Sequence, residues 1–182
     1  MEFRESRLKF IFNEDSWQVM HFDKTPEYSD VARSLQGVKA IDFLAFNNNC
    51  LHLFEIKNFR GYGHIHANQQ RVANYMEDLT TEIAQKVKDT VALLVGFGRN
   101  DNTAHRLWCL SLKHLAGFKH VIITAWIEED PSSSVHAKRK KSELNIKLEK
   151  LKKKLFWLTP IVTIENVLHR NFQYEGFNVE PD

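Results

Sequence analysis

Two apolar segments separated by three asparagines dominate the first half of the chain. Asparagine tolerates the positive backbone φ angles of a two-residue β-hairpin turn, so Asn48 and Asn49 are expected at the tip of a hairpin. This turn sets a register in which Asp42 lies directly opposite Glu55. Lys57 follows two residues later and therefore shares the face of Glu55 on the second strand.

The rest of this hairpin is apolar on both faces. Leu44 and Phe46 share the face of Asp42, and Ile41 and Phe43 lie on the opposite face. Such a strand pair is expected inside a sheet that is covered on both sides, where a carboxylate needs a charge partner. Two carboxylates directly opposite each other destabilise a strand pair. A divalent cation would offset this repulsion, because hard cations prefer carboxylate oxygens.

The arrangement of Asp42 with Glu55-Ile56-Lys57 resembles the motif of the PD-(D/E)XK nuclease superfamily, whose members share the restriction-endonuclease-like fold. The resemblance implies that Asp42 and Glu55 bind Mg²⁺ (or Mn²⁺). It also implies that the carbonyl of Ile56 is a third metal ligand and that Lys57 is the catalytic lysine, which assists the attacking water. The family motif often has proline before the aspartate, where this chain has Ile41.

The same resemblance implies further active-site residues. In this family a helix before the first core strand can supply a glutamate, and a helix beside the active strand often supplies a polar residue. Glu5 is the first candidate if residues 3–12 form a helix, and Glu27 is the candidate otherwise. Gln85 and Lys86 are the candidates on the later helix, where an exposed polar face is an equally good interpretation.

The pattern before the hairpin predicts short elements. Strand-favouring residues over 7–23, interrupted by turn residues at 13–16, favour a β-hairpin. A helical stripe over residues 3–12 is the alternative. Pro26 and Gly37 mark the expected start and end of a short helix.

The pattern after the hairpin predicts three helices and two strands. Apolar residues recur at intervals of three and four in the helical segments, and a β-branched run indicates a buried strand. Thr80 or Thr81 is a candidate cap in the first helical segment. The predicted helices cover residues 69–97, 104–115 and 138–154, and the predicted strands cover residues 120–127 and 161–167.

Together these elements predict one α/β domain over residues 1–182, with a mixed central β-sheet that has α-helices on both faces. By resemblance this domain is restriction-endonuclease-like. Its core is expected at residues 17–127, followed by a basic amphipathic helix and a final strand at 135–168. The length and the 43% hydrophobic content fit an ordinary globular domain.

The sequence contains no apolar run long enough to span a membrane, and its charged N-terminus is unlike a signal peptide. The only cysteines, Cys50 and Cys109, form neither a disulfide framework nor a zinc motif. We therefore expect reduced thiols and a cytoplasmic protein.

Charge is unevenly distributed along the chain. The formal net charge is +2, but residues 138–154 hold nine basic and two acidic side chains, and the rest holds 16 basic and 21 acidic ones. A basic element on a mildly acidic body favours a polyanionic partner, although a solvated lysine face is an equally good interpretation. The side chains expected to contact nucleic-acid phosphates are Lys138, Arg139, Lys140, Lys141, Lys147, Lys150, Lys154 and, after the hairpin, Arg60.

These features predict a metal-dependent nuclease that hydrolyses phosphodiester bonds of nucleic acid, with DNA as the expected substrate. Such nucleases serve in restriction, phage defence, repair and mobile elements. The alternative is a non-catalytic nucleic-acid-binding or regulatory subunit that keeps the fold and acts with a partner, and a homodimer is also compatible with the sequence. A third interpretation is a structural ion-pair cluster, in which Lys57 alone would leave one carboxylate without a partner charge.

Overall fold

The computed structural model describes residues 1–47, 50–61, 66–99, 106–117, 120–130, 134–168 and 175–182. Within these ranges, the side chains of residues 66–78, 106 and 134–140 are not described. The strands are β1 (Glu2–Glu5), β2 (Leu8–Phe12), β3 (Gln18–His21), β4 (Phe43–Asn47), β5 (Cys50–Asn58), β6 (Val121–Glu128), β7 (Val162–Glu165) and β8 (Phe177–Pro181). The helices are α1 (Pro26–Ser34), α2 (His66–Arg99), α3 (Arg106–Ala116) and α4 (Ser134–Leu155), with a 3-10 turn at Phe22–Lys24.

The strands form two sheets. The larger one has the order β3-β4-β5-β6-β7, in which β3, β4 and β5 are antiparallel while β5, β6 and β7 are parallel. The smaller one is antiparallel, with the order β1-β2-β8. The predicted mixed α/β architecture is therefore confirmed.

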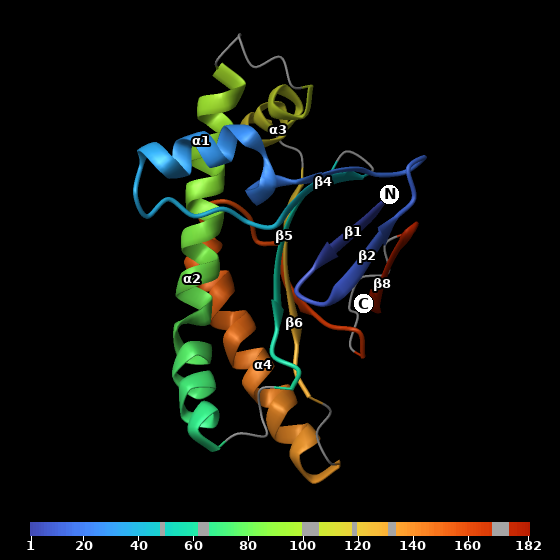
Figure 1. Ribbon diagram of the computed structural model, residues 1–182, viewed down its shortest axis with the longest axis vertical. Helices are drawn as coiled ribbons and strands as arrows, with labels where there is room; N and C mark the ends of the chain where they lie inside the picture. The colour runs from blue at the N-terminus through green and yellow to red at the C-terminus, as the bar shows by residue number, and fades with distance from the viewer. Residues whose placement is uncertain (48–49, 62–65, 100–105, 118–119, 131–133, 169–174) are drawn as a thin grey trace.

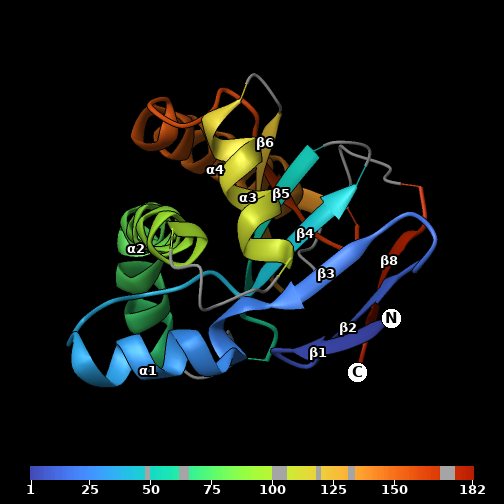
Figure 2. The same cartoon turned by 90° about the horizontal axis from the view of Figure 1, so that it is seen from above.

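The two faces of the larger sheet are covered differently. Figure 1 shows the four helices on one side of this sheet and the small sheet on the other, and Figure 2 gives the same layers from above. The expectation of helices on both faces is therefore wrong. The face toward the small sheet carries aromatic side chains, and Phe43 and Phe54 pack against Phe10 and Phe12 of β2. A small β-sheet rich in phenylalanine buries this surface as well as a helix would.

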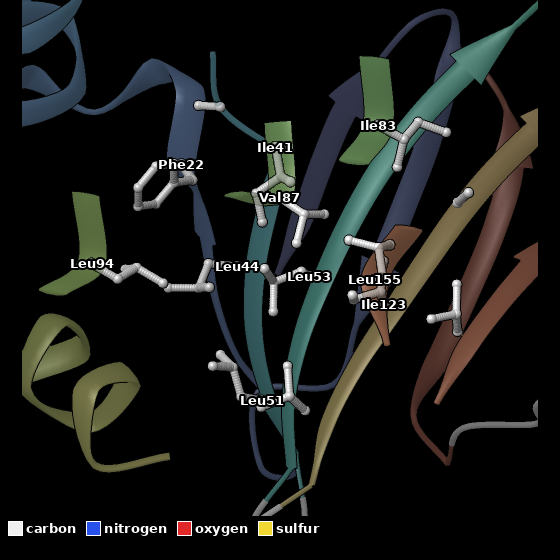
Figure 3. Packing of buried hydrophobic residues seen from close by; sticks show 14 of the residues in the cluster. Phe22, Ile41, Leu44, Leu51, Leu53, Ile83, Val87, Leu94, Ile123 and Leu155 are labelled. Carbon is white, nitrogen blue, oxygen red and sulfur yellow. The ribbon is translucent and has the colours of Figure 1, made fainter. Parts of the chain in front are cut away.

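The helix-covered face holds the larger apolar core. Leu44 and Leu53 of the central strands meet Ile83 and Val87 of α2 there, as Figure 3 shows. Ile41 also lies in this core, although strand alternation predicted the opposite face. The reason is that β4 begins only at Phe43, so Ile41 precedes the strand and does not follow its alternation.

The first strands were predicted correctly as strands, but their pairing was not. β2 and β3 lie in different sheets, so the expected hairpin over residues 7–23 is wrong. The hairpin that does form joins β1 to β2, with positive φ angles at Ser6 and Arg7. These angles fit a tight two-residue hairpin turn. The alternative helix over residues 3–12 is excluded.

Later elements largely follow the sequence pattern. β6 is buried along its whole length, as its β-branched composition predicts, and α4 buries Leu151 and Leu155. α2 is one continuous helix of 34 residues, and neither Thr80 nor Thr81 caps it. Strand β8 was not predicted, because Val179 is its only buried residue and the strand depends on its pairing with β2.

Among the residues that the structure describes, no helix combines the length and the apolarity that crossing a bilayer requires.

Candidate functional site

The predicted register of the central hairpin is confirmed. Phe43 pairs with Phe54, so Asp42, one residue before β4, lies at the level of Glu55. The backbone N–H of Asp42 donates to the carbonyl of Phe54 (3.1 Å), and Asp42 Oδ2 accepts a 2.6 Å hydrogen bond from the N–H of Ile56. These bonds hold the aspartate against the second strand. The turn at residues 48–49 lies outside the described residues.

Both carboxylates are buried on the helix-covered face. Asp42 is 5% exposed and Glu55 is 1% exposed. Lys57 lies on the same side, as strand alternation predicts, and its Nζ is 3.1 Å from Glu55 Oε1. The sequence-predicted group of Asp42, Glu55 and Lys57 is thus brought together, near the carboxyl end of a strand with a parallel neighbour. In open α/β sheets that edge is the usual location of ligand sites.

Helix α2 adds two charged side chains to this group. The Nζ atom of Lys86 lies 2.7 Å from Glu55 Oε1, 2.9 Å from Glu55 Oε2 and 3.7 Å from Asp42 Oδ1, so one ammonium bridges the two carboxylates. Glu82 contacts the other ammonium, with Oε1 2.9 Å from Lys57 Nζ. The resulting charged cluster consists of Asp42, Glu55, Lys57, Glu82 and Lys86. It contains three carboxylates and two ammonium groups.

Two side chains one turn further along α2 fix the chain just before Asp42. Asp89 Oδ2 accepts a 3.1 Å hydrogen bond from the N–H of Lys39, and Thr90 Oγ1 accepts one of the same length from the N–H of Ile41. Because this segment has left the regular ladder, these bonds replace the missing strand pairing. They explain how an aspartate outside β4 keeps a defined position.

Burial and charge shift the proton affinities of the cluster. Burial raises the pKa of Asp42, and burial followed by the nearby Asp42 charge raises the pKa of Glu55 to about 8. For Lys57 and Lys86, burial acts to lower the pKa, but the carboxylates that contact them raise it above its ordinary value. Both lysines therefore stay protonated at neutral pH, while the two carboxylates retain protons more readily than exposed ones.

The two candidates on α2 have different outcomes. Lys86 joins the cluster, whereas Gln85 Nε2 donates to Asp89 Oδ1 (2.7 Å) on the same helix. Glu82 was missed by the sequence analysis. Its signal is its position four residues before Lys86, which places both side chains on one helix face.

The two candidates for an additional glutamate also differ. Glu5 lies on strand β1, and its charge acts in the direction that raises the pKa of Asp42. Its Oε2 contacts His21 Nε2 (3.1 Å) and Lys24 Nζ (2.8 Å), and the His21 hydrogen bond lowers the Glu5 pKa to about 2. Glu27 lies in the first turn of α1, and no hydrogen bond or ion pair joins it to the cluster within the described residues.

A second buried ion pair lies at the end of the neighbouring strand. Arg60 Nη2 is 2.5 Å from Glu128 Oε2, and Glu128 Oε1 accepts hydrogen bonds from Trp126 Nε1 (2.9 Å) and the N–H of Val167 (2.7 Å). The guanidinium group predicted to contact phosphate is therefore occupied within the protein. We regard Arg60 as a structural residue, because its partner carboxylate is 2% exposed.

The basic helix presents several of its predicted phosphate contacts to solvent. Lys141, Lys150 and Lys154 are exposed, whereas Lys147 is half-buried and forms an ion pair with Glu129 (3.5 Å). The side chains of Lys138, Arg139 and Lys140 lie outside the described residues.

The cluster offers few donor atoms for a metal ion. Among the described residues, no three carboxylate, imidazole or thiolate side chains converge as metal ligands. A pair of carboxylates nevertheless suits Mg²⁺, which usually binds one or two carboxylates and keeps water and phosphate oxygens as its other ligands. Glu55 Oε1 fits the role of a Mg²⁺ ligand, because it is buried and accepts no hydrogen bond. Its contacts with Lys57 and Lys86 are ion pairs that do not have hydrogen-bond geometry. Comparison of the chain with protein-family models, curated proteins and solved structures gave no match.

Proposed function

We propose that this protein is a Mg²⁺-dependent nuclease that hydrolyses phosphodiester bonds, with DNA as the expected substrate. One observation carries the proposal: Asp42 and Glu55 are buried side by side and share a single cation, the ammonium of Lys86. Two carboxylates in such contact are costly to bury, so an arrangement of this kind is more often retained for chemistry than for stability.

The proposed fold assignment is restriction-endonuclease-like. It is supported by the antiparallel hairpin β4–β5 inside a mixed sheet and by the three motif residues on one face near the end of β5. The aromatic cover by a second small sheet is a feature of this chain that the resemblance did not imply.

Asp42 and Glu55 are the residues proposed to hold Mg²⁺ (or Mn²⁺), with the Ile56 carbonyl as a further donor. When bound, the ion would supply an acidic water ligand and positive charge near the phosphate. Ile56 N–H holds Asp42 Oδ2, which leaves Asp42 Oδ1 directed to the shared cation position. The protein thus orients this carboxylate before any ligand arrives.

The two lysines have distinct proposed roles. Lys57 is held between Glu55 and Glu82 and is half-buried, so its ammonium has a fixed position next to the carboxylates. From there it would orient the attacking water or stabilise charge that develops on the phosphate. Lys86 offsets part of the negative charge of the carboxylate pair when no divalent cation is present, and a bound divalent cation would replace this contact.

The alternative is a non-catalytic nucleic-acid-binding or regulatory subunit that acts with a partner. A specific observation favours it: two ammonium groups contact the buried carboxylates, so each carboxylate has a charge partner within the protein without a metal ion. The objection that a structural ion-pair cluster would leave one carboxylate unpaired is wrong, because Lys86 contacts both.

Plasmid cleavage separates these functions. Purified protein is incubated with supercoiled DNA in Mg²⁺, in Mn²⁺ and in chelator, beside the variants Asp42→Asn and Lys57→Met. We expect metal-dependent cleavage by the parent protein only, with DNA retention on a gel unchanged in the variants. Cleavage by all three proteins would place the catalytic site elsewhere. Binding without any cleavage by the parent would support the subunit alternative.

A further inference from the structure

The C-terminal end of α4 carries two aromatic side chains on the protein surface. Phe156 is 78% exposed and Trp157 is 48% exposed. Both follow Leu155, the last helical residue, which is buried together with Leu151. Because these two leucines anchor the helix end in the core, the rings that follow lie outside it. Within the described part of the chain, neither ring contacts another aromatic ring.

Two lysines lie next to these rings. The chain continues in a helical turn after α4, since the N–H groups of Leu158 and Thr159 both donate to the carbonyl of Leu155 (2.9 and 3.1 Å). Side chains three and four residues apart on such a turn are neighbours. Lys153 and Lys154 therefore flank Trp157, and both are exposed. Lys153, Lys154, Phe156 and Trp157 form what we call the aromatic-lysine patch.

We propose that the aromatic-lysine patch binds single-stranded nucleic acid by stacking bases on Phe156 and Trp157. Aromatic rings beside lysines suit a flexible polyanion with accessible base faces, because the rings stack on bases while the ammonium groups contact phosphates. A duplex hides its base faces and gains only the phosphate contacts. This inference rests on the proposed function and narrows its substrate to nucleic acid with a single-stranded stretch.

The position of the patch is compatible with one substrate reaching both sites. Thr159 Oγ1 donates to the carbonyl of Val121 (2.6 Å), so the patch adjoins the start of β6. Ala125, four residues further along β6, pairs with Glu55. At about 3.3 Å per residue, Val121 and Ala125 are about 13 Å apart, so Thr159 and Glu55 are offset by about this distance in the strand direction. A short oligonucleotide spans such a distance.

Intrinsic fluorescence provides a direct test, because only one of the four tryptophans is accessible. Trp17, Trp108 and Trp126 are at most 1% exposed, whereas Trp157 is 48% exposed. Titration with a short oligothymidylate in chelator is expected to quench the accessible fraction of the emission. The variant Trp157→Phe is expected to lose this quenching while it retains binding, since phenylalanine also stacks.

Affinity measurements give the quantitative outcome. Trp157→Ala is expected to weaken oligothymidylate binding about 5- to 100-fold and duplex binding less than about twofold. Leu35→Ala, a change at another exposed apolar residue, is the control and is expected to bind like the parent. Unchanged affinity in Trp157→Ala would overturn the proposal. A blue shift of the Trp157 emission with anionic lipid vesicles, at a higher affinity than that for the oligonucleotide, would also overturn it, in favour of a membrane surface.

Binding by the aromatic-lysine patch can be tested independently of the proposed nuclease activity. Glu55→Gln is expected to keep the oligonucleotide quenching, because the patch does not include the charged cluster. Leu35→Ala, a change outside both the patch and the charged cluster, is expected to keep metal-dependent nicking of plasmid. If neither the parent nor any variant nicks the plasmid but the oligonucleotide still quenches the fluorescence, the nuclease proposal is rejected and the proposal for the patch stands.

Discussion

Two buried glutamates near the carboxyl ends of the adjacent parallel strands β5 and β6 have opposite environments. Glu128 on β6 is surrounded by donors: a guanidinium, an indole N–H and a backbone N–H. Glu55 on β5 faces another carboxylate and is held by the ammonium groups of two lysines. The first environment satisfies the charge of Glu128 with directed hydrogen bonds. In the second, a metal ion could replace the cations that contact Glu55. Burial alone therefore does not distinguish a structural acid from a candidate catalytic acid.

The largest effect is expected from Glu55→Gln on activity. The neutral isostere keeps the volume but removes one of the two proposed metal ligands, so we expect cleavage to fall by about 10³-fold or more. Its free energy of unfolding should change little, because the buried charge of Glu55 is itself unfavourable. Plasmid nicking rates and urea denaturation measure the two quantities. Glu149→Gln, at a side chain that is 64% exposed, serves as the control. Full activity of Glu55→Gln would show that Glu55 is not a catalytic acid.

The next largest effect is expected from Glu128→Ala on stability. This change leaves the Arg60 guanidinium half-buried without its carboxylate and removes the acceptor of two N–H groups. We expect the free energy of unfolding to fall by about 3–5 kcal/mol, measured by urea denaturation. The cleavage rate of the folded fraction should be unchanged. A loss below about 1 kcal/mol would show that Glu128 is not the structural acid we describe.

Lys86→Met tests the role of the ammonium that bridges the two carboxylates. In chelator the variant should be less stable than the parent, because the buried carboxylates lose their shared cation. Addition of Mg²⁺ should then stabilise it more than the parent, by about 1–3 kcal/mol when the ion is well above its Kd. Thermal melting with and without Mg²⁺ measures this difference. Lys88→Met, at a side chain that is 60% exposed on the same helix, is the matched control. Equal Mg²⁺ shifts in all three proteins would contradict the model of a shared cation site.

The last expected effect is a pH dependence of stability. The pKa of Glu55 rises from 4.5 to about 8 on folding, so the folded state binds more protons between these values. Stability without metal should therefore fall as pH rises from about 5 to about 8. Glu5 acts in the opposite direction at lower pH, since its pKa falls to about 2 and its contribution is lost as pH falls from about 4.5 toward 2.

Urea midpoints measured across this pH range in chelator test the effect. The Glu55→Gln variant should show a flatter dependence between pH 5 and pH 8 than the parent. The same slope in both proteins would mean that Glu55 does not titrate in this window.

The motif residues could be predicted because they depend on local information. Strand alternation and the asparagine turn were sufficient to bring Asp42, Glu55 and Lys57 together. The other members of the cluster could not be predicted with the same certainty. Lys86 was one of two equally plausible candidates on α2, and Glu82 had no signal beyond its spacing from Lys86. Helical periodicity identifies a polar face but does not tell which strand that face meets.

Local apolar spacing is enough to predict the hairpin register, the buried strand β6 and the amphipathic basic helix, because each of them lies within one segment of the chain. What covers each face of the sheet depends instead on contacts between distant segments. Apolar alternation has the same form whether a helix or a second sheet lies above it, so β1, β2 and β8 could not be assigned to one face in advance. The same limit applies to Arg60 and Glu128, whose pairing depends on two segments that meet only in the folded chain.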